Sequence, residues 1–142
     1  MSKDLTEIRV DQYVFNHVPP RYRFSIAHEL SHVVLHSEFI QNADFQSVDE
    51  WKQYIESGIT EKEYSWLEWQ ADMLAGMMLV PLPELQSRFK EAVRRAESEG
   101  LEITPDGPAM AYISSWLGRN VFEVSQLTAE IRIKNESLFH IL

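Results

Sequence analysis

Apolar residues recur at helical spacing along most of the chain, but one stretch near the N-terminus alternates instead. Residues 7–16 hold β-branched and aromatic residues in partial alternation, which predicts a strand. Residues 24–36 contain no glycine or proline and carry apolar side chains three and four positions apart, which predicts a first helix. Pro19 and Pro20 together end the predicted strand, because proline supplies no N–H to a sheet.

Local start and stop signals define the later helices. Thr60 and Glu63 have the spacing of a capping box, so we expect a second helix from there to about Val80, where Pro81 stops it. The polar segment before this helix predicts a loop with a short helix near residues 51–56. Proline at the start and glycine at the end predict a third helix over residues 83–99. Two shorter helices, over residues 109–117 and 124–135, are predicted on either side of a turn at Gly118.

These elements predict a compact, mainly helical α+β domain with a small N-terminal sheet. The 142 residues suffice for one hydrophobic core, and the 44% hydrophobic composition excludes a mostly disordered chain. We therefore expect a single domain over residues 1–142. Its first part, 1–81, would hold the strand and the first two helices, and 82–142 would form a C-terminal helical part.

Charge and composition indicate the cellular location of the protein and the classes of partner that it can bind. The chain has no cysteine, its N-terminus is charged from the start, and no apolar stretch approaches the roughly 20 residues that span a bilayer. We expect a cytoplasmic protein with no membrane partner. The net charge is −9, and residues 38–72 hold nine acidic against two basic side chains. The last two predicted helices and the glycine-containing turn between them resemble a DNA-binding helix-turn-helix. From Arg88 onward, however, seven basic and eight acidic residues give no basic face, so we expect no direct nucleic-acid partner.

The pentapeptide His28-Glu29-Leu30-Ser31-His32 carries the strongest chemical signal. It lies in a predicted helix, where one turn separates the two histidines, so both imidazoles project from one face and can share a metal ion. Glu29 lies about 100° around the helix, close enough to act as a general base without occupying a ligand position.

A catalytic zinc site needs a third protein ligand. His36 is one candidate, but along a straight helix it lies about 12 Å from His28, so it more readily supports the site from outside. Glu68 on the second predicted helix is the better candidate. Asp72 follows it on the same face and can accept the free ring N–H of a ligating histidine. Small residues at Ala71, Ala75 and Gly76 would let the two helices approach closely.

The segments from Arg21 to His36 and from Glu68 to Pro81 together resemble the core of the ImmA/IrrE metallopeptidases, which are gluzincins with a zincin-like fold. The resemblance implies one zinc ion per chain, held by His28, His32 and Glu68, with Glu29 as general base. It also implies a regulatory endopeptidase that cleaves a helix-turn-helix repressor, often encoded beside it. Asp72 replaces the usual asparagine of the family and still provides an acceptor for a histidine.

The implied reaction is peptide hydrolysis. Glu29 accepts the proton of a water molecule, whose pKa the zinc lowers, as the water attacks a peptide carbonyl. A second hydrogen-bond donor to the oxyanion is expected, and four residues qualify by type: Tyr54, Tyr64, Tyr112 and His140. The alternative is a metal-containing binding or toxin-like module that regulates a partner without proteolysis, although such a module has no need of Glu29.

Overall fold

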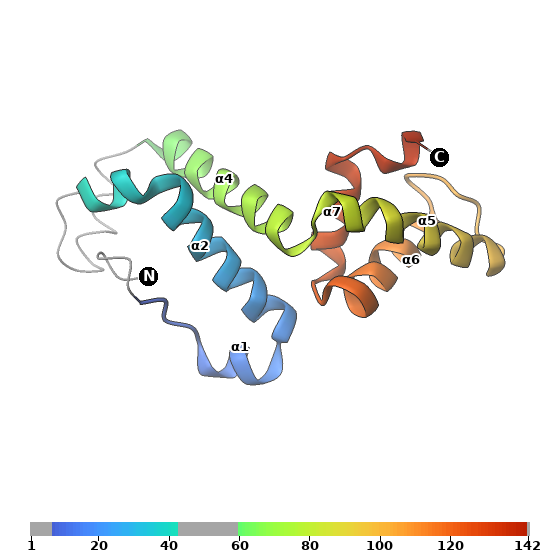
Figure 1. The fold of residues 1–142 in the computed structure, drawn as a ribbon, viewed down its shortest axis with the longest axis horizontal. Helices are drawn as coiled ribbons and strands as arrows, with labels where there is room; N and C mark the ends of the chain where they lie inside the picture. The colour runs from blue at the N-terminus through green and yellow to red at the C-terminus, as the bar shows by residue number, and fades with distance from the viewer. Residues whose placement is uncertain (1–6, 43–59, 142) are drawn as a thin grey trace.

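The computed structural model describes residues 7–42 and 60–141, and every regular element in those ranges is a helix (Figure 1). The prediction of an α+β fold with a small N-terminal sheet is wrong for this part of the chain, which contains no strand. The short helix expected near residues 51–56 lies outside the described residues. In chain order the helices are α1 Gln12–His17, α2 Pro19–Asn42, α4 Glu61–Leu79, α5 Leu82–Ser98, α6 Pro108–Leu117, the π-helix η1 Gly118–Phe122, α7 Gln126–Asn135 and the 3-10 helix η2 Leu138–Ile141.

Helix α1 replaces the second half of the strand predicted over residues 7–16, and residues 7–11 have no regular structure. The Asp11 carboxylate accepts a hydrogen bond from the Val14 N–H at 3.0 Å and so caps the first turn. A strand needs a neighbouring strand to satisfy its backbone groups, whereas a capped helical turn satisfies them locally. The alternating pattern was therefore outweighed by a cap and by the lack of a partner strand among the described residues.

Helix α2 begins at Pro19, a favourable first position because a helix leaves its first N–H groups unpaired. It is longer than the predicted helix over 24–36 and reaches Asn42. The expected end nevertheless marks a real change, since the His36 backbone is not helical (φ −126°, ψ 16°) and the helix is kinked there. The last turns run in a new direction beyond the kink (Figure 1).

The predicted boundaries of the next two helices are confirmed. Thr60 and Glu63 form the capping box: the Glu63 N–H donates to the Thr60 hydroxyl at 3.2 Å, and the Thr60 N–H donates to the Glu63 carboxylate at 2.8 Å. After α5, Gly100 adopts a positive φ of 78°, and the Leu101 N–H returns to the Ala96 carbonyl at 3.0 Å.

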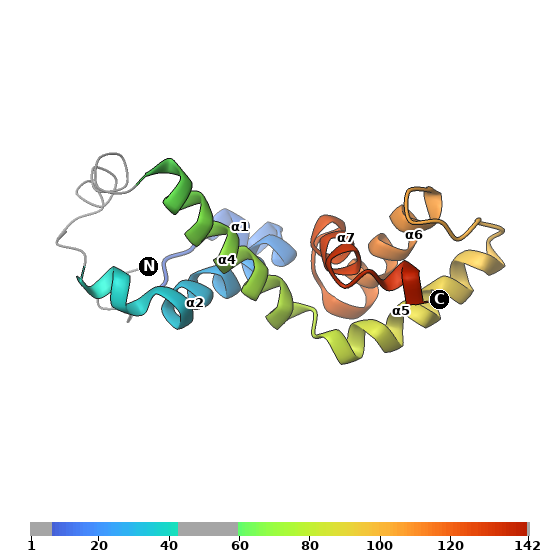
Figure 2. The same cartoon turned by 90° about the horizontal axis from the view of Figure 1, so that it is seen from above.

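The helices fall into two groups along the molecule (Figures 1 and 2). Helices α5, α6 and α7 surround the main apolar core, whose fully buried side chains include Leu85, Phe89, Ile113, Leu117 and Ile133. Helices α2 and α4 pack side by side at the other end. Among the described helices none is both long and apolar enough to cross a membrane.

Two arginines join these groups. Arg23 on α2 donates to the Phe122 carbonyl at 2.7 Å and to the Glu123 carbonyl at 3.0 Å, just after the π-helix. Arg132 on α7 is buried and donates to the Val80 carbonyl at the end of α4 at 3.3 Å. A Cβ atom at Gly76 would lie 3.3 Å from the Arg132 side chain, so this glycine makes room for α7.

Candidate metal centre

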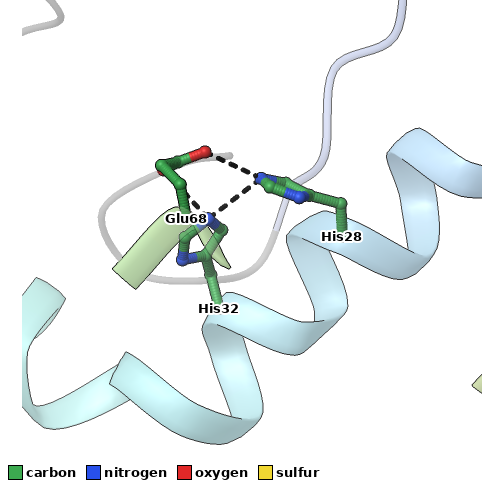
Figure 3. Close-up of side chains that lie close together, drawn as sticks. All are labelled: His28, His32 and Glu68. Atoms are coloured by element: carbon green, nitrogen blue, oxygen red, sulfur yellow. Dashed lines mark hydrogen bonds and ion pairs between the residues drawn. The ribbon is translucent and has the colours of Figure 1, made fainter. Parts of the chain in front are cut away.

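The α2–α4 pair brings His28, His32 and Glu68 together. The two Nε2 atoms lie 3.0 Å apart, and the Glu68 carboxylate oxygens lie 3.2 Å from the His28 Nε2 and 3.4 Å from the His32 Nε2 (Figure 3). Several buried positions of the pair hold small residues, namely Ala27 and Ser31 on α2 and Ala71 and Ala75 on α4. Small side chains let the helix axes approach until a carboxylate from one reaches imidazoles on the other.

The spacing of these atoms fits a metal ion. Nitrogen and oxygen ligands about 2.0–2.2 Å from a tetrahedral zinc ion lie about 3.3–3.6 Å from one another. The ligand atoms of the three residues lie within 4.8 Å of each other, and the closest contacts are 3.0 to 3.4 Å. Two imidazoles and one carboxylate also form a donor set of catalytic zinc sites, which leaves a fourth position for water.

Two predicted supporting residues lie behind the histidines. The His28 Nδ1–H donates to the Asp72 carboxylate at 2.8 Å, which leaves His28 Nε2 pointing at the site. His36 is buried, and its Nδ1 lies 2.9 Å from the Nδ1 of His32, so it contacts the back of that imidazole and does not join the three candidate ligands. His36 also bonds Gln70 of α4 at 3.0 Å, a residue to which the sequence pattern gave no role.

Tyr64 lies beside the candidate ligands. Tyr64 lies one turn before Glu68 on α4, so its phenol is near that carboxylate. Burial raises the pKa of Tyr64, and the negative charges of Glu68 and Glu29 raise it further. The phenol therefore lies near the Glu68 carboxylate and within electrostatic range of Glu29.

The other candidate oxyanion donors are placed differently. Tyr112 packs against the C-terminal core, and His140 is exposed in η2. Tyr54 lies outside the described residues. Among the described candidates, Tyr64 is thus the one that contacts the site.

Charge couples the three candidate ligands even without a metal. Hydrogen bonds from His28 and His32 lower the pKa of Glu68 to about 2. The hydrogen bond with Glu68, helped by Asp72 and opposed by burial, raises the pKa of His28 to about 9. At neutral pH a proton on His28 therefore links the two helices through the same atoms that would bind a metal.

This proton predicts how metal affinity changes with pH. Zinc must displace it, so the apparent zinc affinity of the purified chain should rise about tenfold per pH unit from pH 7 to 9 and level off above the His28 pKa of about 9. Glu68 adds no slope in this range because its pKa is about 2. Competition with a chelator of known affinity measures the change, and an affinity that stays constant from pH 7 to 9 would contradict it.

Comparison with known proteins agrees with this geometry. No curated protein and no solved structure shows significant similarity to the chain. The sequence model of one protein family, the IrrE N-terminal-like domain (Peptidase_M78), matches residues 15–134, a range that includes both helices of the site. The resemblance drawn from the two motifs is thereby confirmed: the chain belongs to this metallopeptidase family.

Proposed function

We propose that the protein is a zinc-dependent endopeptidase that cleaves a helix-turn-helix transcriptional repressor. The observation that carries the proposal is the meeting of His28, His32 and Glu68 within ligand distance of one another, with Glu29 next to His28 in the pentapeptide. A structural zinc site usually has four protein ligands, whereas three protein ligands that leave the fourth position to water are typical of hydrolytic sites.

Each residue of the site has a separate role in peptide hydrolysis. A bound zinc ion would supply a Lewis acid that makes water acidic and stabilises negative charge on the carbonyl oxygen. Glu29 accepts a proton from the attacking water and then delivers it to the amine nitrogen as the C–N bond breaks. Asp72 holds His28 in the tautomer that presents Nε2. Tyr64 donates its O–H to the carbonyl oxygen as that oxygen becomes an oxyanion.

The assignment of Tyr64 predicts the effect of Tyr64→Phe. Loss of one oxyanion donor should lower kcat by about 10²–10³-fold, with little change in KM. The zinc affinity should stay near that of the parent, because the phenol is not a ligand. Tyr112→Phe is the matched control, since Tyr112 packs against the C-terminal core. A kcat equal to that of the parent would exclude Tyr64 as the donor.

The choice of a repressor as substrate rests on family resemblance and on charge. Residues 38–72, which run from the end of α2 through the first part of α4, carry a net charge of −7. A DNA-binding protein is basic on its nucleic-acid face, so an acidic segment beside the site would speed its encounter with the peptidase. Four of the nine acidic residues, Asp44, Asp49, Glu50 and Glu56, lie outside the described ranges and are known from the sequence alone.

The test uses the helix-turn-helix protein encoded beside the gene. We expect the zinc-loaded chain to cut it into discrete fragments with new N-termini, which mass spectrometry identifies. A chelator should stop the cleavage and added zinc should restore it. A neighbouring repressor that stays intact with the zinc-loaded protein would overturn the choice of substrate.

A further inference from the structure

A line of hydrogen bonds leads from the candidate metal centre back into the α2–α4 interface. His32 and His36 face each other through their Nδ1 atoms at 2.9 Å, and the His36 Nε2 lies 3.0 Å from the Oε1 of Gln70. His36 is only 6% exposed, so its ring is largely shielded from water. The line starts on α2, where His36 lies at the kink, and ends on α4.

The chemistry of the last member sets the direction of every bond in this line. An amide Oε1 can only accept, so the His36 Nε2 must carry the hydrogen. A neutral His36 then has its lone pair on Nδ1 and accepts from the His32 Nδ1–H. This leaves the lone pair of His32 on Nε2, the atom that lies 3.0 Å from the His28 Nε2 and 3.4 Å from Glu68.

The reverse direction would close the metal site. If the Gln70 amide presented its NH₂ group, His36 would accept at Nε2 and donate from Nδ1, and His32 would accept at Nδ1. The hydrogen of His32 would then lie on Nε2, where a metal ion needs a lone pair. The two ligating histidines are thus held by different partners, since Asp72 orients His28 and the His36–Gln70 line orients His32.

We propose that Gln70 is a positioning residue of the metal site: acting through His36, its amide oxygen fixes His32 in the tautomer that offers Nε2 to the metal. The proposal rests on the metal site of the proposed function but not on peptidase activity. A residue that orients a ligand in this way typically changes metal affinity by about 10- to 100-fold when it is removed.

The first test compares zinc affinities by chelator competition. Gln70→Met keeps the length of the side chain and removes the acceptor, so we expect a 10- to 100-fold loss of affinity. Gln70→Glu keeps an acceptor and should restore affinity to within a few-fold of the parent. Gln86→Met is the control, because Gln86 is exposed on α5. If Gln70 only linked the two helices structurally, its replacement would lower the thermal stability of the metal-free protein. The zinc affinities of Gln70→Met and Gln70→Glu would then not differ.

The second test reads the tautomer directly in the zinc-loaded parent protein. Two-bond ¹H–¹⁵N spectra of the imidazoles should show His36 protonated on Nε2 and His32 protonated on Nδ1. His36 protonated on Nδ1, or an unchanged zinc affinity in Gln70→Met, would overturn the proposal. A parent chain that binds no zinc would overturn the metal site itself, whereas a chain that binds zinc with these tautomers but cleaves nothing would overturn only the peptidase function.

Discussion

Replacement of Glu29 by Gln should abolish cleavage while the metal site stays intact. Glutamine matches glutamate in size, so the α2–α4 pair and its three candidate ligands keep their places. It cannot accept a proton from water at neutral pH, and loss of a general base costs about 10²–10⁴-fold in rate. We expect kcat/KM for the repressor to fall by that factor, with about one zinc ion still bound per chain, as measured by metal analysis.

This variant also separates the peptidase from a module that regulates its partner without proteolysis. Glu38→Gln serves as the matched control, because Glu38 is exposed on α2 beyond the kink at His36. If Glu29→Gln relieved repression as fully as the parent, the effect would come from binding, and the proposed hydrolysis would be wrong.

Removal of Glu68 should have the largest effect on the metal. Glu68→Ala leaves two imidazoles on one helix and removes the ligand that α4 contributes, so we expect zinc affinity to fall by more than about 100-fold. Asp72→Ala removes a hydrogen bond to His28 but no ligand, so its loss should stay within about 10- to 100-fold. Chelator competition ranks the two variants, and Glu97→Ala on the exposed side of α5 is the control.

Glu68→Ala should also remove the stabilisation that zinc gives to the fold. A ligand that binds only the folded state raises the melting temperature as its concentration exceeds its Kd. We expect added zinc to raise the Tm of the parent and to leave Glu68→Ala unchanged at the same concentration. Full zinc occupancy and an undiminished Tm shift in Glu68→Ala would show that another residue is the third ligand.

The features that could be predicted from sequence are those set by neighbours within one turn. The capping box of Thr60 and Glu63 and the left-handed Gly100 depend on contacts three to five residues away, and the structure confirms them. The same holds for the shared helix face of His28 and His32. The pairing of Glu68 with these histidines is not local, but the sequence indicated it because two separate motifs each matched one half of a known site.

The features that could not be predicted depend on contacts between elements. Residues 7–16 alternate as a strand does, yet Asp11 caps a helix there, and no sequence pattern reveals whether a partner strand will be available. Gly76 was expected to let α2 approach α4, but the space that a Cβ atom at Gly76 would take is next to the Arg132 side chain of α7. The contact of Gln70 with His36 likewise depends on the register of α2 against α4, which neither helix encodes alone.

The small residues between α2 and α4 have a consequence for motion. Ala27, Ser31, Ala71 and Ala75 bury little apolar area, whereas α5–α7 enclose leucine, isoleucine and phenylalanine side chains. Segments with less buried apolar area open locally at a lower free energy, so backbone amides of the helix pair should exchange with solvent sooner than those of the C-terminal core. A metal ion binds only the closed pair and suppresses these openings. The event that equips the site for chemistry would then also make its scaffold rigid.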